Sequence, residues 1–313
     1  MASLNSPLHP KALRYLAAVA QLGSVQAAAR EVSISASAID RQILMLEEDM
    51  GVPLFERLPR GMRLTAAGEL LLALSQRWKT DLNRTLSDVK QLQGVSQGQL
   101  RLAAMDSHVN GFLPGFIHRV ASEHPGIVLE VDIVSTDEAV RCLTEGAVDL
   151  AIAFNLKPQR ELHLVWTADL PLGCVAAIGH ALAACQQVTF KDVAAWPLAV
   201  QSHALAIRRY LERRHSWLLQ EARPPLVTNS LQLVKSLVKS GSHVALTSEL
   251  DAGPEILDGS MRFIPLSDKN AQPQTIGVAI SAARSIPRIG RIVADLLADH
   301  VERYLAAVRA KSA

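Results

Sequence analysis

Apolar residues recur at intervals of three and four through much of the first fifty positions, and this is the spacing of one face of an α-helix. One such stretch is residues 8–21, and two more lie within residues 24–50. The polar break Ser33-Ile34-Ser35 separates these two, and Gly51 ends the second at a position that favours a left-handed backbone. The pattern therefore predicts three short helices, of which the last two meet at a tight turn.

Small polar residues stand where the two joined helices begin. Ser24 and Ser35 are both suited to capping a helix N-terminus. Arg41 and Gln42 fall early in the second helix, beside short side chains such as Ser37, so this end can approach a groove closely. This is the layout of a helix-turn-helix whose second helix enters the major groove of DNA. The helix pattern taken alone favours an ordinary helical hairpin.

The next stretch, residues 51–68, is basic and contains a turn signal. It carries Arg57, Arg60 and Arg63, with Gly61 at the turn and a single acidic residue. A short basic hairpin beside a helix-turn-helix is a wing, which is suited to phosphate or minor-groove contacts. We therefore predict that these arginines contact DNA together with Ser24, Ser35, Ser37, Arg41 and Gln42.

These segments resemble the LysR-type transcriptional regulators. The resemblance is carried by LRYLAAVAQLGSVQAAA, then AIDRQILMLEEDMGVPLFER, then RLTAAGE, in this order and spacing, and it extends through the whole length. Two positions depart from the family pattern. The family often has a Gln-Pro pair where this chain has Ala36-Ser37, and it usually has Ser where this chain has Asp40. Base preference is therefore not carried over from the family.

A long helix is predicted from the Thr65 cap to about Gln93. Seven positions in it alternate steps of four and three, as in a heptad seam: Leu71, Ser75, Trp78, Leu82, Thr85, Val89 and Leu92. Packing against the protein's own surface is the alternative. The outer positions are polar, however, and the helix follows a DNA-binding unit, so a dimerising linker is favoured. The Gly- and Ser-rich segment 94–98 then predicts a hinge and a domain boundary.

After the hinge, strand-like and helix-like runs alternate. This alternation predicts a parallel sheet covered on both faces, built as two α/β halves with crossings near residues 155–166 and 265–275. The architecture resembles the periplasmic binding proteins, which the LysR-type family uses for its effector domain. The predicted strands are residues 100–104, 127–134, 149–154, 172–178, 198–201, 226–230, 244–248 and 275–280, and the predicted helices are 112–124, 136–146, 204–214, 231–240 and 287–308.

Polar side chains follow five of these strands. In open α/β sheets, ligands bind beyond the carboxyl ends of the strands and against helix N-termini. A cleft that binds a small polar effector is therefore predicted. Thr136 and Ser230, taken singly, are better explained as caps of their own helices. The predicted effector-binding residues are Asp106, Ser107, His108, Thr136, Gln201, Ser202, His203 and Thr247.

Asp106 has two interpretations. A carboxylate in the cleft favours a cationic or hydroxyl-rich effector, whereas an ion pair with Arg101 makes Asp106 structural, and the structural pairing is the preferred one. His108 and His203 lack partners at metal-ligand spacing. They are therefore predicted to be hydrogen-bonding walls of the cleft, and no metal or cofactor is expected.

Composition limits the alternatives further. The chain has 313 residues, of which 49% are hydrophobic, so two or three folded units are expected. The net charge is only +2, and any DNA-binding field must come from the placement of charges. There is no signal-peptide core and no long apolar run, so a cytoplasmic protein without a membrane partner is expected. Nucleophile elbows, phosphate-binding loops and His-Glu metal motifs are absent, and an enzyme is not expected.

The three cysteines are Cys142, Cys174 and Cys185, and they form no metal-spaced cluster. In a reducing cytosol, buried thiols are the default. Some relatives in the family sense oxidants through a cysteine pair in this domain, which makes a Cys174–Cys185 switch the alternative. The only basic side chain near either thiol in the sequence is His180, and nothing else there lowers a thiol pKa.

The resulting hypothesis is a sequence-specific transcriptional regulator. Residues 1–65 are a winged helix-turn-helix, residues 66–95 are a linker and dimerisation helix with a hinge, and residues 96–313 are an effector-binding domain. The expected partners are double-stranded promoter DNA, a small-molecule effector and a second copy of the chain, with a homotetramer implied by the family resemblance and RNA polymerase as a candidate. A thiol redox sensor and a ligand-independent repressor are the alternatives on the same fold.

Overall fold

The computed structural model describes residues 8–58, 61–92, 98–202, 206–221, 226–282, 286 and 288–312. His203 and Arg60, which the sequence proposes as binding residues, lie outside these ranges. The chain divides near residue 95 into two compact units, and each of them is described by itself. Within the described residues, none of the helices combines the length and the apolar character that crossing a membrane requires.

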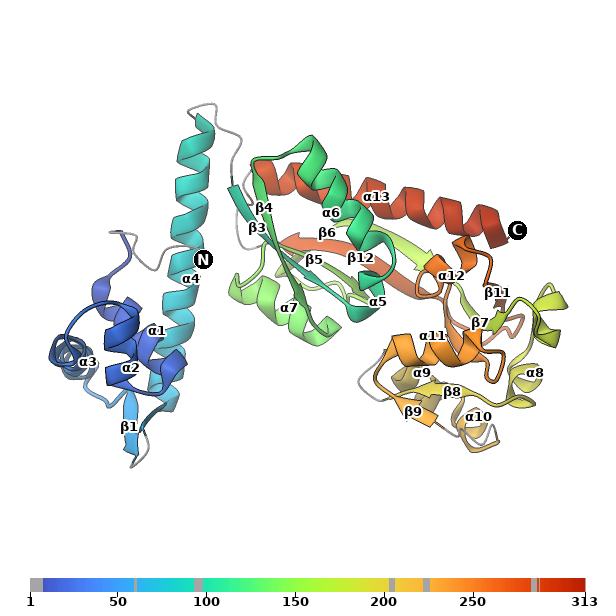
Figure 1. The fold of residues 1–313 in the computed structure, drawn as a ribbon, viewed down its shortest axis with the longest axis horizontal. Helices are drawn as coiled ribbons and strands as arrows, with labels where there is room; N and C mark the ends of the chain where they lie inside the picture. Colours follow the sequence, from blue (N-terminus) through green and yellow to red (C-terminus); the bar gives the residue numbers. More distant parts are fainter. Residues whose placement is uncertain are drawn as a thin grey trace. The chain divides into compact units, whose positions relative to one another are not determined.

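The N-terminal unit begins with the three predicted helices, α1 (Lys11–Leu22), α2 (Val25–Glu31) and α3 (Ala36–Met50) (Figure 1). Both predicted caps form: Ser24 Oγ accepts from the Ala27 amide at 3.4 Å, and Ser35 Oγ accepts from the Ala38 amide at 3.3 Å. Gly51 has a φ of 69°, the left-handed conformation that ends α3. The apolar faces of the helices meet in one core, whose fully buried residues are Leu16, Val19, Ala28, Ile39, Ile43 and Leu54.

The predicted wing is an antiparallel hairpin of β1 (Phe55–Leu58) and β2 (Gly61–Leu64). The Met62 amide donates to the Gly23 carbonyl at 2.8 Å, which ties the hairpin to the end of α1. A Cβ at position 61 would lie 2.5 Å from that carbonyl oxygen, and Gly61 has a φ of 135°. Only glycine fits both conditions without strain, so this contact depends on the turn residue noted in the sequence.

Helix α4 (Ala66–Leu92) is the predicted long helix, and it begins where Thr65 Oγ1 accepts from the Gly68 amide at 3.1 Å. The predicted heptad seam is wrong at its first two positions. Leu71 packs against the core of the unit, and the buried Ser75 hydroxyl donates to the Leu13 carbonyl at 3.5 Å. Two later members of the predicted seam, Trp78 and Val89, are exposed, and they are joined on the surface by Leu74 and by Leu70, which is 73% exposed.

The C-terminal unit starts with a five-stranded sheet in the order β4-β3-β5-β12-β6. Its members are β3 (Gly98–Ala104), β4 (Ile127–Ile133), β5 (Leu150–Phe154), β6 (Leu162–Leu170) and β12 (Gln274–Ser281). Strand β3 is parallel to β4 and β5, but β12 is antiparallel to both β5 and β6. The expectation of a purely parallel sheet is therefore wrong, because β12, which returns from the second half, runs antiparallel to both of its neighbours.

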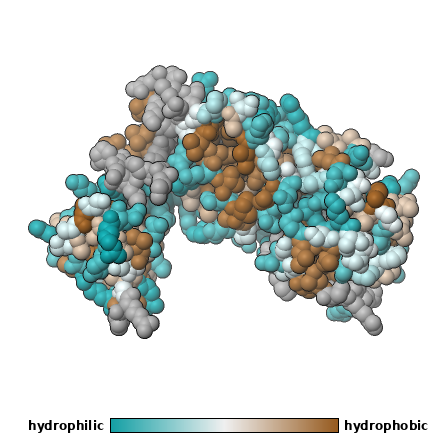
Figure 2. Space-filling view, in the orientation of Figure 1, coloured by the Kyte–Doolittle hydropathy of each residue, from teal (hydrophilic) through white to brown (hydrophobic). Residues whose placement is uncertain are grey.

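Helices cover both faces of this sheet. Figure 1 shows α6 (Phe112–Glu123) and α13 (Arg288–Ser312) on one side and α7 (Thr136–Glu145) on the other, with the short α5 (Asp106–Val109) after β3. In Figure 2, brown side chains gather over the region of α6 and β4, where Ile117 and Val128 are exposed. Strand β4 lies at an edge of the sheet, so its outer backbone groups have no neighbouring strand within the sheet.

The second half is built around β7 (Leu172–Ala177), which is antiparallel to β10 (Ala245–Ser248) and β11 (Met261–Pro265). The pair β8 (Ala199–Gln201) and β9 (Leu226–Thr228) is joined to β10 by a bridge between Leu198 and Val244. Around these strands are a 3-10 helix (Ala181–Ala184), α8 (Phe190–Ala194), α9 (Ala206–Arg214), α10 (Ser216–Glu221), α11 (Leu231–Lys239) and α12 (Gly253–Leu257).

The chain crosses between the halves at Pro171 and again between Pro265 and Gln274. The predicted first crossing near residues 155–166 is wrong, because residues 162–170 form β6 and pair with β12 along its length. Helix α13 spans both halves: Leu297 lies in the first core and Val308 in the second. Near its C-terminus, Arg309 forms an ion pair with Glu249 at 2.6 Å.

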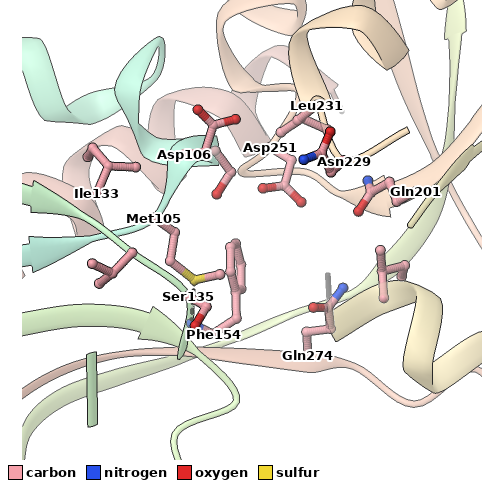
Figure 3. Close-up of a pocket in the computed structure, with 13 residues that line it drawn as sticks. Met105, Asp106, Ile133, Ser135, Phe154, Gln201, Asn229, Leu231, Asp251 and Gln274 are labelled. Atoms are coloured by element: carbon pink, nitrogen blue, oxygen red, sulfur yellow. Dashed lines mark hydrogen bonds between the residues drawn. The ribbon is translucent and has the colours of Figure 1, made fainter. Parts of the chain in front are cut away.

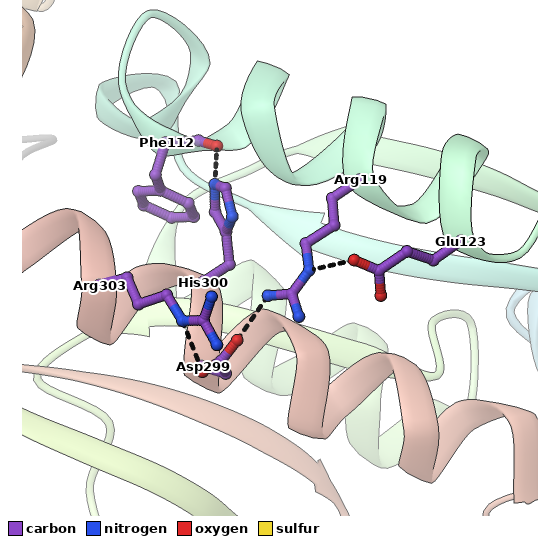
Figure 4. A network of polar contacts seen from close by, with 6 residues as sticks. All are labelled: Phe112, Arg119, Glu123, Asp299, His300 and Arg303. Atoms are coloured by element: carbon purple, nitrogen blue, oxygen red, sulfur yellow. Dashed lines mark hydrogen bonds and ion pairs between the residues drawn. The ribbon is translucent and has the colours of Figure 1, made fainter.

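Polar contacts also attach α13 to α6 (Figure 4). The Arg119 guanidinium on α6 donates to Asp299 on α13 and, at 2.8 Å, to Glu123 on its own helix. The His300 imidazole donates to the Phe112 carbonyl at 3.1 Å. Burial lowers the pKa of His300, which keeps this contact between neutral groups at physiological pH.

Candidate functional site

A pocket of about 260 Å³ lies between the two halves of the C-terminal unit (Figure 3). The first half contributes the carboxyl ends of β3, β4 and β5, and the second half contributes the ends of β8 and β9, the start of α11 and the turn after β10. The polar lining residues are Asp106, Ser107, Ser135, Gln201, Asn229, Asp251 and Gln274, and the apolar ones are Met105, Ile133, Val134, Phe154, Ile207 and Leu231.

Asp251 is the most constrained polar group in this lining. It sits in the turn between β10 and α12, with only 8% of its surface exposed. Its Oδ2 accepts from Thr247 Oγ1 at 2.6 Å and from Ser248 Oγ at 3.0 Å. Burial raises the pKa of Asp251, and the hydroxyls of Thr247, Ser248 and Ser107 oppose that rise. Two buried hydroxyl donors therefore hold a carboxylate against the pocket.

The other lining acid, Asp106, is exposed on the opposite half of the pocket. The preferred interpretation of Asp106 as a partner of Arg101 is wrong, because the Arg101 guanidinium forms its ion pair with Glu130 at 2.8 Å. The geometry of a β-strand explains this outcome: Arg101 and Glu130 are register partners on β3 and β4, whereas Asp106 lies beyond the end of β3.

Two further predicted residues, Ser107 and Gln201, line the pocket as expected from their strand ends. Ser202 adjoins the described end of β8, where its amide donates to the Thr228 carbonyl at 2.8 Å. It is not part of the pocket lining.

Three predicted residues have other places in the structure. His108 is buried between the rings of Phe112 and Phe154, and burial lowers its pKa to about 3. It is therefore a neutral core residue and does not line the pocket. Thr247 is buried behind Asp251 and acts on the pocket through that carboxylate. Thr136 donates to the Phe154 carbonyl at 3.1 Å and lines a different groove.

The helix-cap alternative is correct for Ser230 and wrong for Thr136. Ser230 Oγ accepts from the Leu233 amide at 3.3 Å, which caps α11. On α7 the cap is the preceding residue, Ser135, whose Oγ accepts from the Glu138 amide at 3.3 Å. Ser135 also lines the pocket, so one residue combines capping with a place in the lining.

Sequence reasoning missed Asp251, Gln274 and the aromatic wall Phe154. The signal for Asp251 was present in the acidic residues that follow the strand end Thr247-Ser248. Gln274 is the first residue of β12, and it is the amino end of this strand that reaches the pocket. A search at the carboxyl ends of strands therefore does not find Gln274.

A second groove, of about 540 Å³, lies beside α9 and contains Thr136. Its lining includes the basic residues Lys157, Arg209, Arg213 and Arg214. Arg209 approaches Asp137 at 3.9 Å. The sign of the charge in this groove is therefore opposite to that in the pocket between the halves.

In the N-terminal unit, a groove of about 420 Å³ separates the start of α3 from the wing. Ser24, Ser37 and Arg57 line it, and Ser37 Oγ donates to Ser35 Oγ at 3.2 Å. Asp40 projects from α3 into the same groove and forms an ion pair with Arg57 at 2.8 Å. The sequence signal for this pairing was the acid at position 40, which departs from the family pattern.

The predicted DNA-binding residues Arg41, Gln42 and Arg63 do not line this groove. Arg41 points outward from α3 and has no ion-pair partner among the residues that the structure describes. Gln42 is half-buried, and its Nε2 donates to Met45 Sδ at 3.5 Å, in keeping with the expectation that it turns toward its own helix. Arg63 pairs with Glu56 at 2.6 Å across the wing, where both side chains are exposed.

Comparison with known proteins decides the family. Residues 10–69 match the model of the bacterial regulatory helix-turn-helix protein, lysR family, and residues 93–302 match the LysR substrate binding domain. The chain belongs to the LysR family of transcriptional regulators. It is 31% identical to a probable nitrogen assimilation transcriptional activator of Synechococcus elongatus, over 73% of this chain and 74% of that one. It is also 30% identical to a RuBisCO operon transcriptional regulator of Allochromatium vinosum, over 75% of this chain and 78% of that one.

Solved structures of full-length regulators share the fold over more than nine tenths of the chain. Full-length CbnR in complex with its target DNA has a TM-score of 0.66 at 19% identity, with 94% of this chain and 99% of that chain covered. A full-length OxyR variant from Pseudomonas aeruginosa has a TM-score of 0.65 at 20% identity, with 91% and 93% covered. These matches agree with the predicted combination of a winged helix-turn-helix, a long helix and a two-part α/β domain.

The cysteines of this LysR regulator differ in exposure. Cys174 is fully buried on β7, and burial raises the pKa of its thiol to about 12. A thiol with this pKa stays protonated at neutral pH, whereas the thiolate is the form that oxidants attack. Cys185 is half-buried, and all three cysteines are free thiols. The burial of Cys174 therefore disfavours the Cys174–Cys185 switch.

Proposed function

We propose that this LysR regulator binds promoter DNA through α3 and the wing, and that a small-molecule effector bound between the two halves of its C-terminal unit alters this binding. The observation that carries the effector part is the pocket itself. Seven polar side chains from both halves converge there, and one of them is a buried carboxylate held by two hydroxyl donors. Such a group of convergent polar side chains in an otherwise apolar pocket is typical of a ligand site.

The proposed DNA contacts fall into two kinds. Arg41 and Ser37 lie on the exposed face near the start of α3, where side chains of a recognition helix reach base edges. Arg57, Arg63 and the wing residue Arg60 are assigned to phosphates, because the hairpin projects beside that helix. Ser24, Ser35 and Gln42 then act by capping and packing, which fixes the two helices relative to each other.

A homodimer is proposed to form along α4. The outward stripe of Leu70, Leu74, Trp78 and Val89 is apolar, and Leu71 and Ser75 already pack against the same chain. Burying the stripe against a second copy would remove these side chains from water. The exposed edge strand β4 and helix α6 offer a second surface, which suits a homotetramer of two such dimers. RNA polymerase is the proposed downstream partner, and the proposed location is the cytoplasm.

The effector is proposed to act through the arrangement of the two halves. Among the described residues, two chain crossings and α13 link the two halves, so a ligand that contacts both halves favours the arrangement in which its contacts are complete. A ligand shifts an equilibrium only by its difference in affinity for the two states. A coupling of roughly 1–3 kcal/mol is typical and is sufficient to alter promoter occupancy severalfold.

The proposed function is tested by filling the pocket. Asn229 is exposed and lines the pocket, so Asn229→Trp places an indole in it with little risk to the core. Val227→Trp is the matched control, since Val227 lies two residues earlier on β9, is exposed, and is not part of the lining. DNA affinity is measured with and without the dialysable fraction of a bacterial cell extract. We expect the Val227→Trp protein to respond as the wild type does and the Asn229→Trp protein to bind DNA without responding. A full response by Asn229→Trp would contradict the proposal.

A further inference from the structure

The charge of the pocket narrows the chemistry of its ligand. Among the described residues that line it, two are carboxylates, Asp106 and Asp251, and none is Lys, Arg or His. The basic side chains of this region lie in the other groove, beside α9. An organic anion in the pocket would therefore face two like charges and, among the described lining residues, no cation.

The hydrogen bonds of Asp251 are incomplete on one side. Both of its hydroxyl donors, Thr247 and Ser248, bind the same oxygen, Oδ2. The other oxygen, Oδ1, is buried, and so is the Ser107 hydroxyl that favours the charged form of Asp251; neither atom makes a hydrogen bond of good geometry within the described structure. An ionised carboxylate accepts hydrogen bonds on both oxygens, and leaving one of them buried without a donor is costly. Asp251 Oδ1 and Ser107 Oγ therefore both have room for a hydrogen bond from a ligand.

Figure 3 shows where that donor would come from. The Asp251 carboxylate and the side-chain amides of Gln201 and Asn229 face the same space, with the ring of Phe154 on the opposite wall. An aromatic face and a carboxylate together are the usual surroundings of a bound ammonium group. The remaining walls are aliphatic, and they suit a short apolar body.

We propose that the effector is a small organic amine, bound in its protonated form, whose ammonium N–H donates to Asp251 Oδ1 and whose apolar body lies against Phe154, Ile207 and Leu231. Asp106, on the facing half, adds to the negative potential and favours closure of the two halves around the cation. This inference rests on the proposed function of the pocket and specifies the ligand class. Aliphatic amines have pKa values near that of lysine, about 10.4, and are therefore cationic at neutral pH.

Matched probes separate charge from shape. We would titrate the full-length protein with isoamylamine, isoamyl alcohol and isovalerate, and in parallel with phenethylamine, phenethyl alcohol and hydrocinnamate, and measure Kd by calorimetry. Each set keeps a similar apolar body and changes the head group from cation to neutral to anion. We expect each amine to bind at least tenfold more tightly than its alcohol and its carboxylate, and we expect the Asn229→Trp protein not to bind them.

Two substitutions then assign the contact. Asp251→Asn keeps the shape of the side chain and removes its charge, and we expect it to weaken amine binding at least tenfold, which corresponds to about 1.4 kcal/mol. Asp295→Asn is the matched control, because Asp295 is an exposed acid on α13 outside the pocket, and it should leave Kd unchanged.

Each contrary result has a separate meaning. The inference is overturned if no amine binds at millimolar concentration, or if Asp251→Asn binds the amines as well as the wild type does. Tight binding of a carboxylate that is lost in Asn229→Trp would also overturn it, while leaving the effector pocket intact. A response to the cell-extract fraction that persists in Asn229→Trp would instead contradict the proposed function itself.

Discussion

Thr247→Val tests whether the hydroxyls behind the pocket hold the Asp251 carboxylate. Valine has nearly the shape of threonine, so the substitution keeps the buried packing and removes one donor. The lost bond is 2.6 Å long and leads to Oδ2 of the buried Asp251 carboxylate. Hydrogen bonds to charged groups contribute about 1.5–3 kcal/mol. We therefore expect the free energy of unfolding of the C-terminal unit to fall by about 2 kcal/mol.

The same change in an Asp251→Asn background isolates the charge. The asparagine carbonyl still accepts from Thr247, but as a neutral pair that contributes about 1 kcal/mol. The cost of Thr247→Val should therefore drop by about 1 kcal/mol in that background, which is the interaction energy of a double-mutant cycle. Thr144→Val is the control, because its exposed hydroxyl bonds only to the Arg141 carbonyl and its loss should cost less than about 0.5 kcal/mol.

The assay is equilibrium unfolding in urea, with thermal melting as the second probe. For a unit of this size, a loss of 2 kcal/mol lowers Tm by roughly 4–8 °C. If Thr247→Val is neutral, or costs the same with Asp251 and with Asn at that position, the hydroxyl does not support the carboxylate and the reasoning fails.

Three further predictions concern α4, the Asp40–Arg57 ion pair and the pH dependence of Asp251. Replacing Leu74 and Trp78 with Asp should shift the sedimenting mass toward monomer, whereas Leu71→Asp should unfold the N-terminal unit; a double variant that stays dimeric would place the dimer interface elsewhere. Asp40→Asn should release Arg57 and remove an acid beside the phosphates, so binding to any DNA should tighten and the salt slope steepen by roughly one unit, and an unchanged slope would argue against the assignment. Burial raises the pKa of Asp251 above its ordinary 3.8, so the folded chain keeps this proton to a higher pH than the unfolded chain does. The protonated carboxyl therefore adds to the free energy of unfolding. This contribution is complete below pH 3.8 and is lost as the pH rises through the raised pKa. The free energy of unfolding, measured from acidic to neutral pH, should therefore fall more steeply for the wild type than for Asp251→Asn. Asp106 is the only other charged group lining the pocket among the described residues. Parallel pH curves for the two proteins would contradict this prediction.

The N-terminal unit could be predicted in detail because its signals are local. Ser24, Ser35 and Gly51 mark helix ends through contacts within one turn, and the structure places all three as expected. The heptad seam of α4 failed at Leu71 and Ser75 for the opposite reason. Which side of a long helix faces its own domain depends on packing against α1, and the spacing of residues within the helix does not contain that information.

The sheet of the C-terminal unit could be predicted only in part. The parallel neighbours of β3 follow from the alternation of strands and helices, but β12 returns from the second half and pairs antiparallel with β5 and β6. The pattern in β6 mixes exposed and buried positions, and residues 155–166 therefore resembled a connection between the halves.

The pocket shows the same limit at the level of single side chains. Strand ends identified the neighbourhood, and Ser107 and Gln201 lie in the lining. Side chains alternate between the two faces of a strand, however, so the sequence does not reveal that Thr247 points behind the pocket. His108 was misplaced because one helical turn after β3 directs its ring into the core.

The central claim, that α3 and the wing make this chain a sequence-specific DNA-binding regulator, is tested most directly by selecting duplexes from a random library with the full-length protein and with Arg41→Ala. The wild type should enrich a motif of two related half-sites, and Arg41→Ala should bind that motif more weakly by roughly 1–3 kcal/mol and lose preference at one or two base positions. Enrichment of no motif by the wild type, or of an identical motif with equal affinity by the variant, would contradict the account.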